Sequence, residues 1–217
     1  MHLPVGEADA EVSGRAKTFF RDWLANPEAG AAYWRDRDHS SRVHEVEAPA
    51  RLFSGWYDFF LRALLDDYEA LVAAGKTPHL RVGPYPHGSL GMTAEVLRET
   101  FAWFDLHLKG QSDQARTKPV RLYVMGADEW REFDAWPPPA EEMHYRLHPV
   151  GRLSPEAPPP NSPPDRYRYD PTDPTPAVGG PLFGFYSKRG AVDNRELESR
   201  PDVLVYTTPR SKRTWRS

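Results

Sequence analysis

Proline is concentrated in one part of this sequence, and that concentration limits which folds the chain can adopt. Of the 23 prolines, 14 lie within residues 137–181. Proline has no backbone N–H and a fixed φ, so a regular helix is not expected there. Short alternations of apolar and polar residues remain at Met143–Leu147 and Tyr167–Tyr169. We therefore predict short strands joined by long proline-rich connections, as in a β-sandwich, rather than a disordered linker.

The composition excludes several classes of protein. The 217 residues include no cysteine, so a disulfide scaffold, a thiolate nucleophile and a Cys-ligated metal site are excluded. A formal net charge of −3 gives no reason to expect nucleic acid as a partner. There is no apolar run of about 18 residues, and the first residues lack the layout of a signal peptide. We therefore expect no membrane partner and a cytoplasmic location.

Residues 48–110 alternate between strand and helix patterns. Residues 48–54 and 79–82 are short apolar runs bounded by proline or glycine, which predicts two strands. An apolar stripe of helical period follows each of them. The first stripe is Leu61, Leu64, Leu65, Tyr68, Leu71 and Val72, and the second is Leu97, Phe101, Phe104 and Leu108. Thr93 is a suitable N-cap for the second helix. This order indicates an α/β unit with parallel strands.

The pattern changes on either side of that unit. Upstream, residues 7–24 are compatible with helix, and Asn26-Pro27 would end it. After Pro119, residues 120–124 alternate apolar and polar side chains, and residues 203–206 form a second candidate strand. We therefore place a boundary at 115–118, between an α/β part and an all-β part.

Two loops that follow the predicted strands contain residues suited to catalysis. Asp58 ends Gly55-Trp-Tyr-Asp58, and His87 lies in Gly83-Pro-Tyr-Pro-His87-Gly88. Sites in parallel sheets form at the carboxyl ends of strands, where a carboxylate can fix the tautomer of an imidazole and stabilise its charged form. Two alternatives remain open: Asp58 could cap the next helix, and His87 could be an exposed loop residue. A metal site of Asp58, His79, His87 and His107 has no supporting ligand spacing, so we expect no metal and no cofactor.

The sequence contains no credible nucleophile to complete a triad. In α/β-hydrolases the order along the chain is Ser, then Asp or Glu, then His. The serines before Asp58 do not lie in a Gly-x-Ser-x-Gly elbow; they are Ser13, Ser40, Ser41 and Ser54. Ser89 follows His87, and His87 occupies the position at which the elbow requires a small residue.

Several motifs, in order, resemble one family. They are Gly55–Asp58, Gly83–Gly88, Phe104–Gly110, Pro119–Trp130, Tyr169–Pro176, Gly179-Gly180 and Arg200–Tyr206. Together they resemble the CocE/NonD hydrolases, the family of cocaine esterase, X-Pro dipeptidyl-peptidases, α-amino-acid ester hydrolases and glutaryl acylases. The resemblance covers residues 17–207.

The resemblance implies a division into parts and a set of site residues. Residues 1–47 would be the end of a helical lid, 48–115 the C-terminal part of an α/β-hydrolase domain, and 116–217 the first part of an incomplete jelly-roll β-sandwich. Asp58 would be the triad acid and His87 the general base. The residues near the acyl pocket would be Trp56 and Phe60, although core packing is the alternative for Trp56.

The resemblance also implies what this sequence lacks. The family's serine and an oxyanion-binding tyrosine belong to an upstream region, and residues 208–217 do not resemble the family's continuation. We therefore interpret the chain as a truncated hydrolase of small ester, amide or peptide substrates. It would be inactive alone and would depend on an upstream hydrolase fragment as a partner. The alternatives are a non-catalytic β-sandwich binding or interaction module and an inactive gene remnant.

Overall fold

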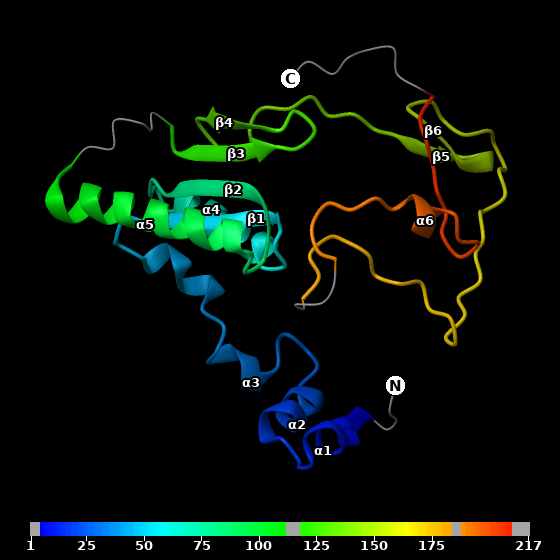
Figure 1. Ribbon diagram of the computed structural model, residues 1–217, viewed down its shortest axis with the longest axis horizontal. Coiled ribbons are helices and arrows are strands. Elements are labelled where there is room, and N and C mark those ends of the chain that lie inside the picture. Colours follow the sequence, from blue (N-terminus) through cyan, green and yellow to red (C-terminus); the bar gives the residue numbers. More distant parts are fainter. Residues whose placement is uncertain (1–4, 112–117, 184–187, 210–217) are drawn as a thin grey trace. The chain divides into compact units, whose positions relative to one another are not determined.

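The computed structural model describes residues 5–111, 118–183 and 188–209 of the chain (Figure 1). The chain divides into two compact units, Met1–Ala48 and Pro49–Ser217. None of the helices in these described ranges combines the length and apolar character that a membrane crossing requires.

The first unit contains short helices. They are η1 (Val5–Glu7), α1 (Ala8–Ser13), α2 (Thr18–Ala25), α3 (Ala32–Arg35) and η2 (Ser40–Glu45). The single helix that we considered for residues 7–24 is interrupted, because Gly14 ends α1 in the left-handed region with φ of 73°. The buried Asp9 carboxylate accepts the backbone N–H of Lys17. That hydrogen bond lowers the pKa of Asp9 and fixes the turn between α1 and α2.

The second unit contains a four-stranded sheet with strand order β1-β2-β3-β4 (Figure 1). The strands are β1 (Arg51–Tyr57), β2 (His79–Pro86), β3 (Val120–Val124) and β4 (Glu129–Phe133). Strands β1, β2 and β3 are parallel, and β4 is antiparallel to β3. Helix α4 (Leu61–Ala73) joins β1 to β2, and α5 (Leu90–Lys109) follows β2. The predicted strand–helix alternation with parallel strands is confirmed.

The sheet continues past the position at which we placed the change of architecture. Residues 112–117, on which most of that boundary falls, lie outside the described residues. Beyond them, β3 is in parallel register with β2, with Leu80 opposite Val120 and Val82 opposite Leu122. Alternation of apolar and polar residues identifies a half-exposed strand but does not tell which sheet it joins.

Helix α4 packs its apolar stripe against one face of the sheet. Tyr68 and Leu71 are buried, while Val72, the last residue of the predicted stripe, is exposed. The buried cluster next to Tyr68 comes from β2 and β3 and consists of Leu80, Val82, Val120 and Leu122. Strand β2 of that cluster ends directly before His87, so burial of Leu80 and Val82 anchors one of the two strands that lead to the candidate site.

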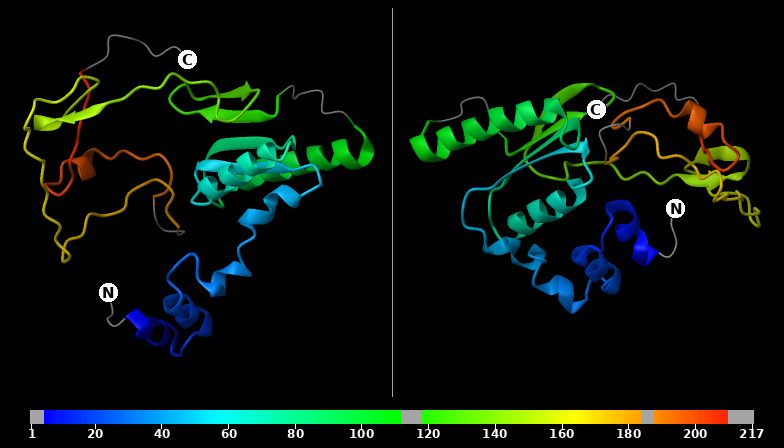
Figure 2. Two further views of the ribbon diagram at one scale, coloured as in Figure 1. Left: turned by 180° about the vertical axis from the view of Figure 1, so that it is seen from behind. Right: turned by 60° about the horizontal axis from the view of Figure 1, so that its bottom comes forward.

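Helix α5 covers the other face (Figures 1 and 2), but not through the stripe that we predicted. The predicted stripe is exposed, at 54% for Leu97, 68% for Phe101, 52% for Phe104 and 77% for Leu108. Glu95 and Glu99 are buried instead and form ion pairs with Arg81 of β2; Glu99 also pairs with Arg51 of β1. The arginines on this face of the sheet require counter-ions, and that requirement sets which face of α5 turns inward.

The proline-rich part contains less regular structure than we predicted. Its strands are β5 (Arg146–His148) and β6 (Arg152–Ser154), joined by η3 (Pro149–Gly151), and a short helix α6 (Arg195–Glu198) follows. The strands predicted at 167–169 and 203–206 are wrong; close to the second, Thr207 forms a single bridge with Arg152. The strands among these described residues are short and few, so the jelly-roll prediction is not confirmed. Prolines donate no hydrogen bond to a ladder, which leaves extended but unpaired chain.

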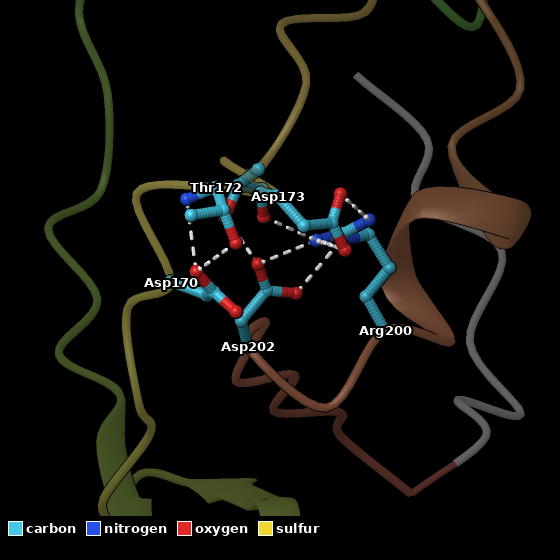
Figure 3. A network of polar contacts seen from close by, with 6 residues as sticks. Asp170, Thr172, Asp173, Arg200 and Asp202 are labelled. Atoms are coloured by element: carbon cyan, nitrogen blue, oxygen red, sulfur yellow. Dashed lines mark hydrogen bonds and ion pairs between the residues drawn. The ribbon is translucent and has the colours of Figure 1, made fainter.

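A polar network joins two of the motifs in this part (Figure 3). The Arg200 guanidinium binds the carboxylates of Asp173 and Asp202, and Asp202 also accepts a hydrogen bond from Thr175. The hydrogen bond from Arg200 is the main cause that lowers the pKa of Asp202. The same pairing raises the pKa of Arg200. The network therefore ties the segment around residue 173 to that around residue 200 without a β-ladder.

Candidate active site

Two adjacent parallel strands bring Asp58 and His87 together. Gly55 of β1 lies opposite Gly83 of β2, and Tyr57 lies opposite Pro86 after an irregularity in the register. Asp58 and His87 are the next residues after these strand ends. The two sequence-predicted catalytic residues therefore lie side by side.

The geometry between the two side chains fits a carboxylate that orients an imidazole. His87 Nδ1 is 3.1 Å from Asp58 Oδ2 and 3.2 Å from Asp58 Oδ1. The Asp58 side chain is buried at 3% exposure, while that of His87 is 36% exposed. Because a carboxylate only accepts hydrogen bonds, this arrangement assigns the proton to Nδ1 and leaves the Nε2 lone pair available as a base.

Asp58 is not the N-cap of α4, as the capping alternative supposed; the N-cap is Phe60, and Asp58 makes a turn hydrogen bond just before it. Asp58 Oδ1 accepts the backbone N–H of Phe60 at 2.9 Å, just before α4 begins. That bond holds the carboxylate in place while both of its oxygens remain within reach of His87. The turn hydrogen bond and the contact with His87 are therefore compatible.

Two phenylalanine rings pack against His87. The centroids of Phe59 and Phe60 lie 4.6 and 5.3 Å from the centroid of the imidazole. Phe183 lies edge-on to Phe59, with 5.6 Å between centroids. Phe60 was identified from the sequence; Phe59 and Phe183 were not. Phe59 could have been found from the sequence because it directly follows Asp58. Nothing in the sequence near Phe183 indicated that it lies close to the site.

Trp56 faces the core instead. Its Nε1 donates to the backbone oxygen of Tyr123 at 2.6 Å, and its ring lies 6.3 Å from that of Trp136. Trp56 also packs against the buried cluster of the sheet. These contacts favour core packing over contact with a substrate.

Gly55 is required by the close approach of strands β1 and β2 near their ends. A Cβ at Gly55 would lie 2.0 Å from the backbone oxygen of Tyr85, which is too close for any side chain. This explains why a glycine opens the motif that ends at Asp58.

We therefore expect Gly55→Ala to lower the free energy of unfolding by about 3 kcal/mol or more, because the obstacle is backbone. Urea unfolding followed by tryptophan fluorescence measures this. Gly30→Ala is the matched control, since a Cβ there meets no atom within 4 Å. Equal effects of the two substitutions would contradict the assigned role of Gly55.

The serines near the site have structural roles. Ser89 Oγ accepts the N–H of Met92 at 3.2 Å and is the N-cap of α5, the role that we predicted for Thr93. Ser54 is 1% exposed in the middle of β1. Neither arrangement presents a hydroxyl to His87 for attack on a substrate.

The histidines of the metal alternative lie in different surroundings. His79 and His107 contact Trp103 with tilted rings, and their centroids lie 5.1 and 4.2 Å from that of Trp103. Over the ranges that the structure describes, no group of three or more His, Asp or Glu side chains is arranged to hold a metal ion.

Comparison with known sequences finds two matches to protein families. Residues 2–89 match X-Pro dipeptidyl-peptidase (S15 family), and residues 113–214 match the X-Pro dipeptidyl-peptidase C-terminal non-catalytic domain. The second match extends through most of the basic segment 208–217, so our expectation that this segment departs from the family is wrong. Residues 210–217 of that segment lie outside the described residues.

Individual relatives agree with these matches. The chain is 31% identical over 226 aligned residues to cocaine esterase from Rhodococcus sp. (strain MB1 Bresler), covering 93% of this chain and 39% of that protein. Its fold matches an aminopeptidase from a marine sediment archaeon (Thaumarchaeota archaeon) with a TM-score of 0.75, at 24% identity and covering 94% of this chain and 37% of the other. An α-amino acid ester hydrolase matches with a TM-score of 0.74, at 22% identity and covering 94% of this chain and 38% of the other.

The chain thus spans about two fifths of the length of these relatives, since it covers 39% of the esterase and 37% and 38% of the two structures. The two family matches together cover most of its length, and the esterase match covers 93% of it. By these matches the chain belongs to the CocE/NonD family of X-Pro dipeptidyl-peptidase-like hydrolases.

Proposed function

We propose that Asp58 and His87 are the acid and the base of a Ser–His–Asp triad that hydrolyses ester or amide bonds. The observation that carries the proposal is the contact of His87 Nδ1 with both Asp58 oxygens at adjacent strand ends. The serine of this triad comes from polypeptide outside these 217 residues. The coverage of about two fifths of each relative supports that assignment.

The reaction follows from the protonation state of the imidazole. His87 Nε2 removes the hydroxyl proton of the serine as its oxygen bonds to the substrate carbonyl carbon. The same nitrogen then donates that proton to the leaving alcohol or amine, and an acyl-enzyme remains. Water, deprotonated in turn by Nε2, releases the acid and restores the serine. Throughout, Asp58 accepts the Nδ1–H and stabilises the imidazolium that forms.

The substrate class in this proposal is a small ester, amide or peptide. The names of the relatives support it, since they are a cocaine esterase, an aminopeptidase and an α-amino acid ester hydrolase. Phe59 and Phe60 border His87, Phe183 lies against Phe59, and the three rings give the site an apolar rim. An apolar acyl group would bury against that rim.

The partner in this proposal is the polypeptide that holds the serine, an upstream hydrolase fragment. Strand β1 is an edge of the four-stranded sheet, with a parallel neighbour on one side. The exposed α5 stripe is a second unpaired surface; it consists of Leu97, Phe101, Phe104 and Leu108. An open edge and an apolar helix face are surfaces that another polypeptide covers. In this scheme residues 1–47 belong to a lid and 116–217 to a jelly-roll.

The absence of a nucleophile is tested with the 217-residue chain alone. A chromogenic ester is incubated with the wild-type chain and with His87→Ala, and release of the leaving group is measured. We expect the same background rate from both proteins, and we expect no covalent labelling by a fluorophosphonate. Hydrolysis by the wild-type chain that disappears in His87→Ala would show that a nucleophile is present after all.

A further inference from the structure

The Gly179-Gly180 motif forms part of a small antiparallel pairing that the triad assignment does not use. Gly180 and Gly190 each donate a backbone N–H to the other's oxygen, at 2.8 and 3.0 Å. Gly179 donates to the oxygen of Lys188 at 3.0 Å. This pairing fixes the backbone on both sides of Arg189, although little regular secondary structure surrounds it.

The paired segment lies against the ends of the two strands that lead to the site. A Cβ placed on Gly190 would be 3.8 Å from Tyr57 Cδ2 and 4.0 Å from the Pro86 ring. Tyr57 and Pro86 are the last residues of β1 and β2. The backbone of Gly190 is therefore close to the residues that immediately precede Asp58 and His87.

From this position Arg189 reaches the backbone of the histidine. Its Nη1 donates to the His87 oxygen at 2.8 Å, and the contact is partly buried. His87 lies between the end of β2 at Pro86 and the N-cap of α5 at Ser89. Gly88 has φ of 66°, so the peptide between His87 and Gly88 belongs to neither element and takes its orientation from local contacts. A charged donor on the His87 oxygen restrains that peptide.

We propose that Arg189 is a positioning residue for His87, supplied by the region that matches the non-catalytic C-terminal domain. Asp58 holds the imidazole ring through Nδ1, and Arg189 holds the backbone from which that ring projects. Together they fix the direction of the Nε2 lone pair. The inference rests on the proposed role of His87 as the base, because proton transfer requires the Nε2 lone pair to point at the reacting hydroxyl.

The test uses NMR spectroscopy of the full 217-residue chain with Arg189→Ala and Arg189→Lys. The ¹³C′ shift of His87 reports the hydrogen bond to its oxygen, and the downfield Nδ1–H resonance reports the pairing with Asp58. Arg195→Ala is the matched control, because Arg195 is 87% exposed and pairs with Asp193. Urea unfolding of each variant shows that it is folded.

We expect Arg189→Ala to move the His87 ¹³C′ resonance and to speed exchange of the Nδ1–H with water by about tenfold, as for the loss of a charged hydrogen bond. Arg189→Lys keeps a donor and is expected to restore part of both signals, and Arg195→Ala should change neither. Unchanged signals in Arg189→Ala, or equal changes in Arg195→Ala, would overturn the inference. Asp58→Ala separates the two proposals. An unaltered Nδ1–H resonance in that variant contradicts the triad assignment. The hydrogen bond from Arg189 is tested independently, by the ¹³C′ shift of His87.

Discussion

Replacing His87 by alanine is expected to lower kcat for ester hydrolysis by about 10⁶-fold once a serine is supplied, as in triads that lose their base. The serine can be supplied by a chimera in which residues 2–214 of this chain replace the matching segment of the Rhodococcus esterase. Asp58→Ala is expected to cost less, about 10⁴-fold, because the imidazole can still accept a proton without its orienting carboxylate. Both losses are measured as kcat with a chromogenic ester.

The matched control for this experiment is His144→Ala. His144 is 73% exposed and pairs with Glu142 in the segment before β5. Its replacement should leave kcat within about twofold, as expected for a surface substitution. A loss below about tenfold in His87→Ala, relative to the same chimera with His87 intact, would contradict the role of His87 as the base.

The largest expected effect on stability comes from Arg81. This guanidinium is 2% exposed and pairs with Glu95 and Glu99 of α5, and its central carbon lies 4.3 Å from the centroid of the Trp130 ring. Desolvation lowers the pKa of Arg81 to about 10, so it remains charged at neutral pH. Arg81→Met removes the cation and leaves buried carboxylates partly uncompensated. We expect a loss of about 3–5 kcal/mol in the free energy of unfolding.

Arg121→Met provides the comparison for Arg81→Met. Arg121 is the register partner of Arg81 on β3, and its guanidinium lies 5.2 Å from the same Trp130 ring. Its replacement removes a cation–π contact and is expected to cost about 1 kcal/mol. Urea unfolding followed by tryptophan fluorescence gives both values. If the two substitutions cost the same, the buried ion pairs of α5 do not stabilise the fold as described.

The parts of the fold that follow from local patterns were predictable. The α4 stripe, the two strand ends and the pairing of Asp58 with His87 all depend on period and on the order of elements, which the sequence displays. The face of α5 was not predictable in this way. Its orientation depends on Arg51 and Arg81, and a stripe of apolar residues contains no information about charges on a neighbouring strand.

In the C-terminal part, prediction of strands from the sequence failed for a different reason. Alternation at 167–169 and 203–206 predicted strands, but a strand also needs a partner with free N–H groups, and prolines near these segments supply none. The contact of Arg189 with His87 joins residues 102 positions apart. No periodic pattern in the sequence identifies such a pair, and the contact is found only in the folded structure.

The central claim, that Asp58 orients His87 as a base, is tested most directly by the tautomer of His87. Two-dimensional ¹H–¹⁵N correlation spectra of the full chain, assigned with His87→Gln, distinguish protonation at Nδ1 from protonation at Nε2. The contact with both Asp58 oxygens predicts the neutral ring with its proton on Nδ1 and a free lone pair on Nε2. A proton on Nε2 in the wild-type chain, or the same Nδ1 tautomer in Asp58→Ala, would contradict the claim.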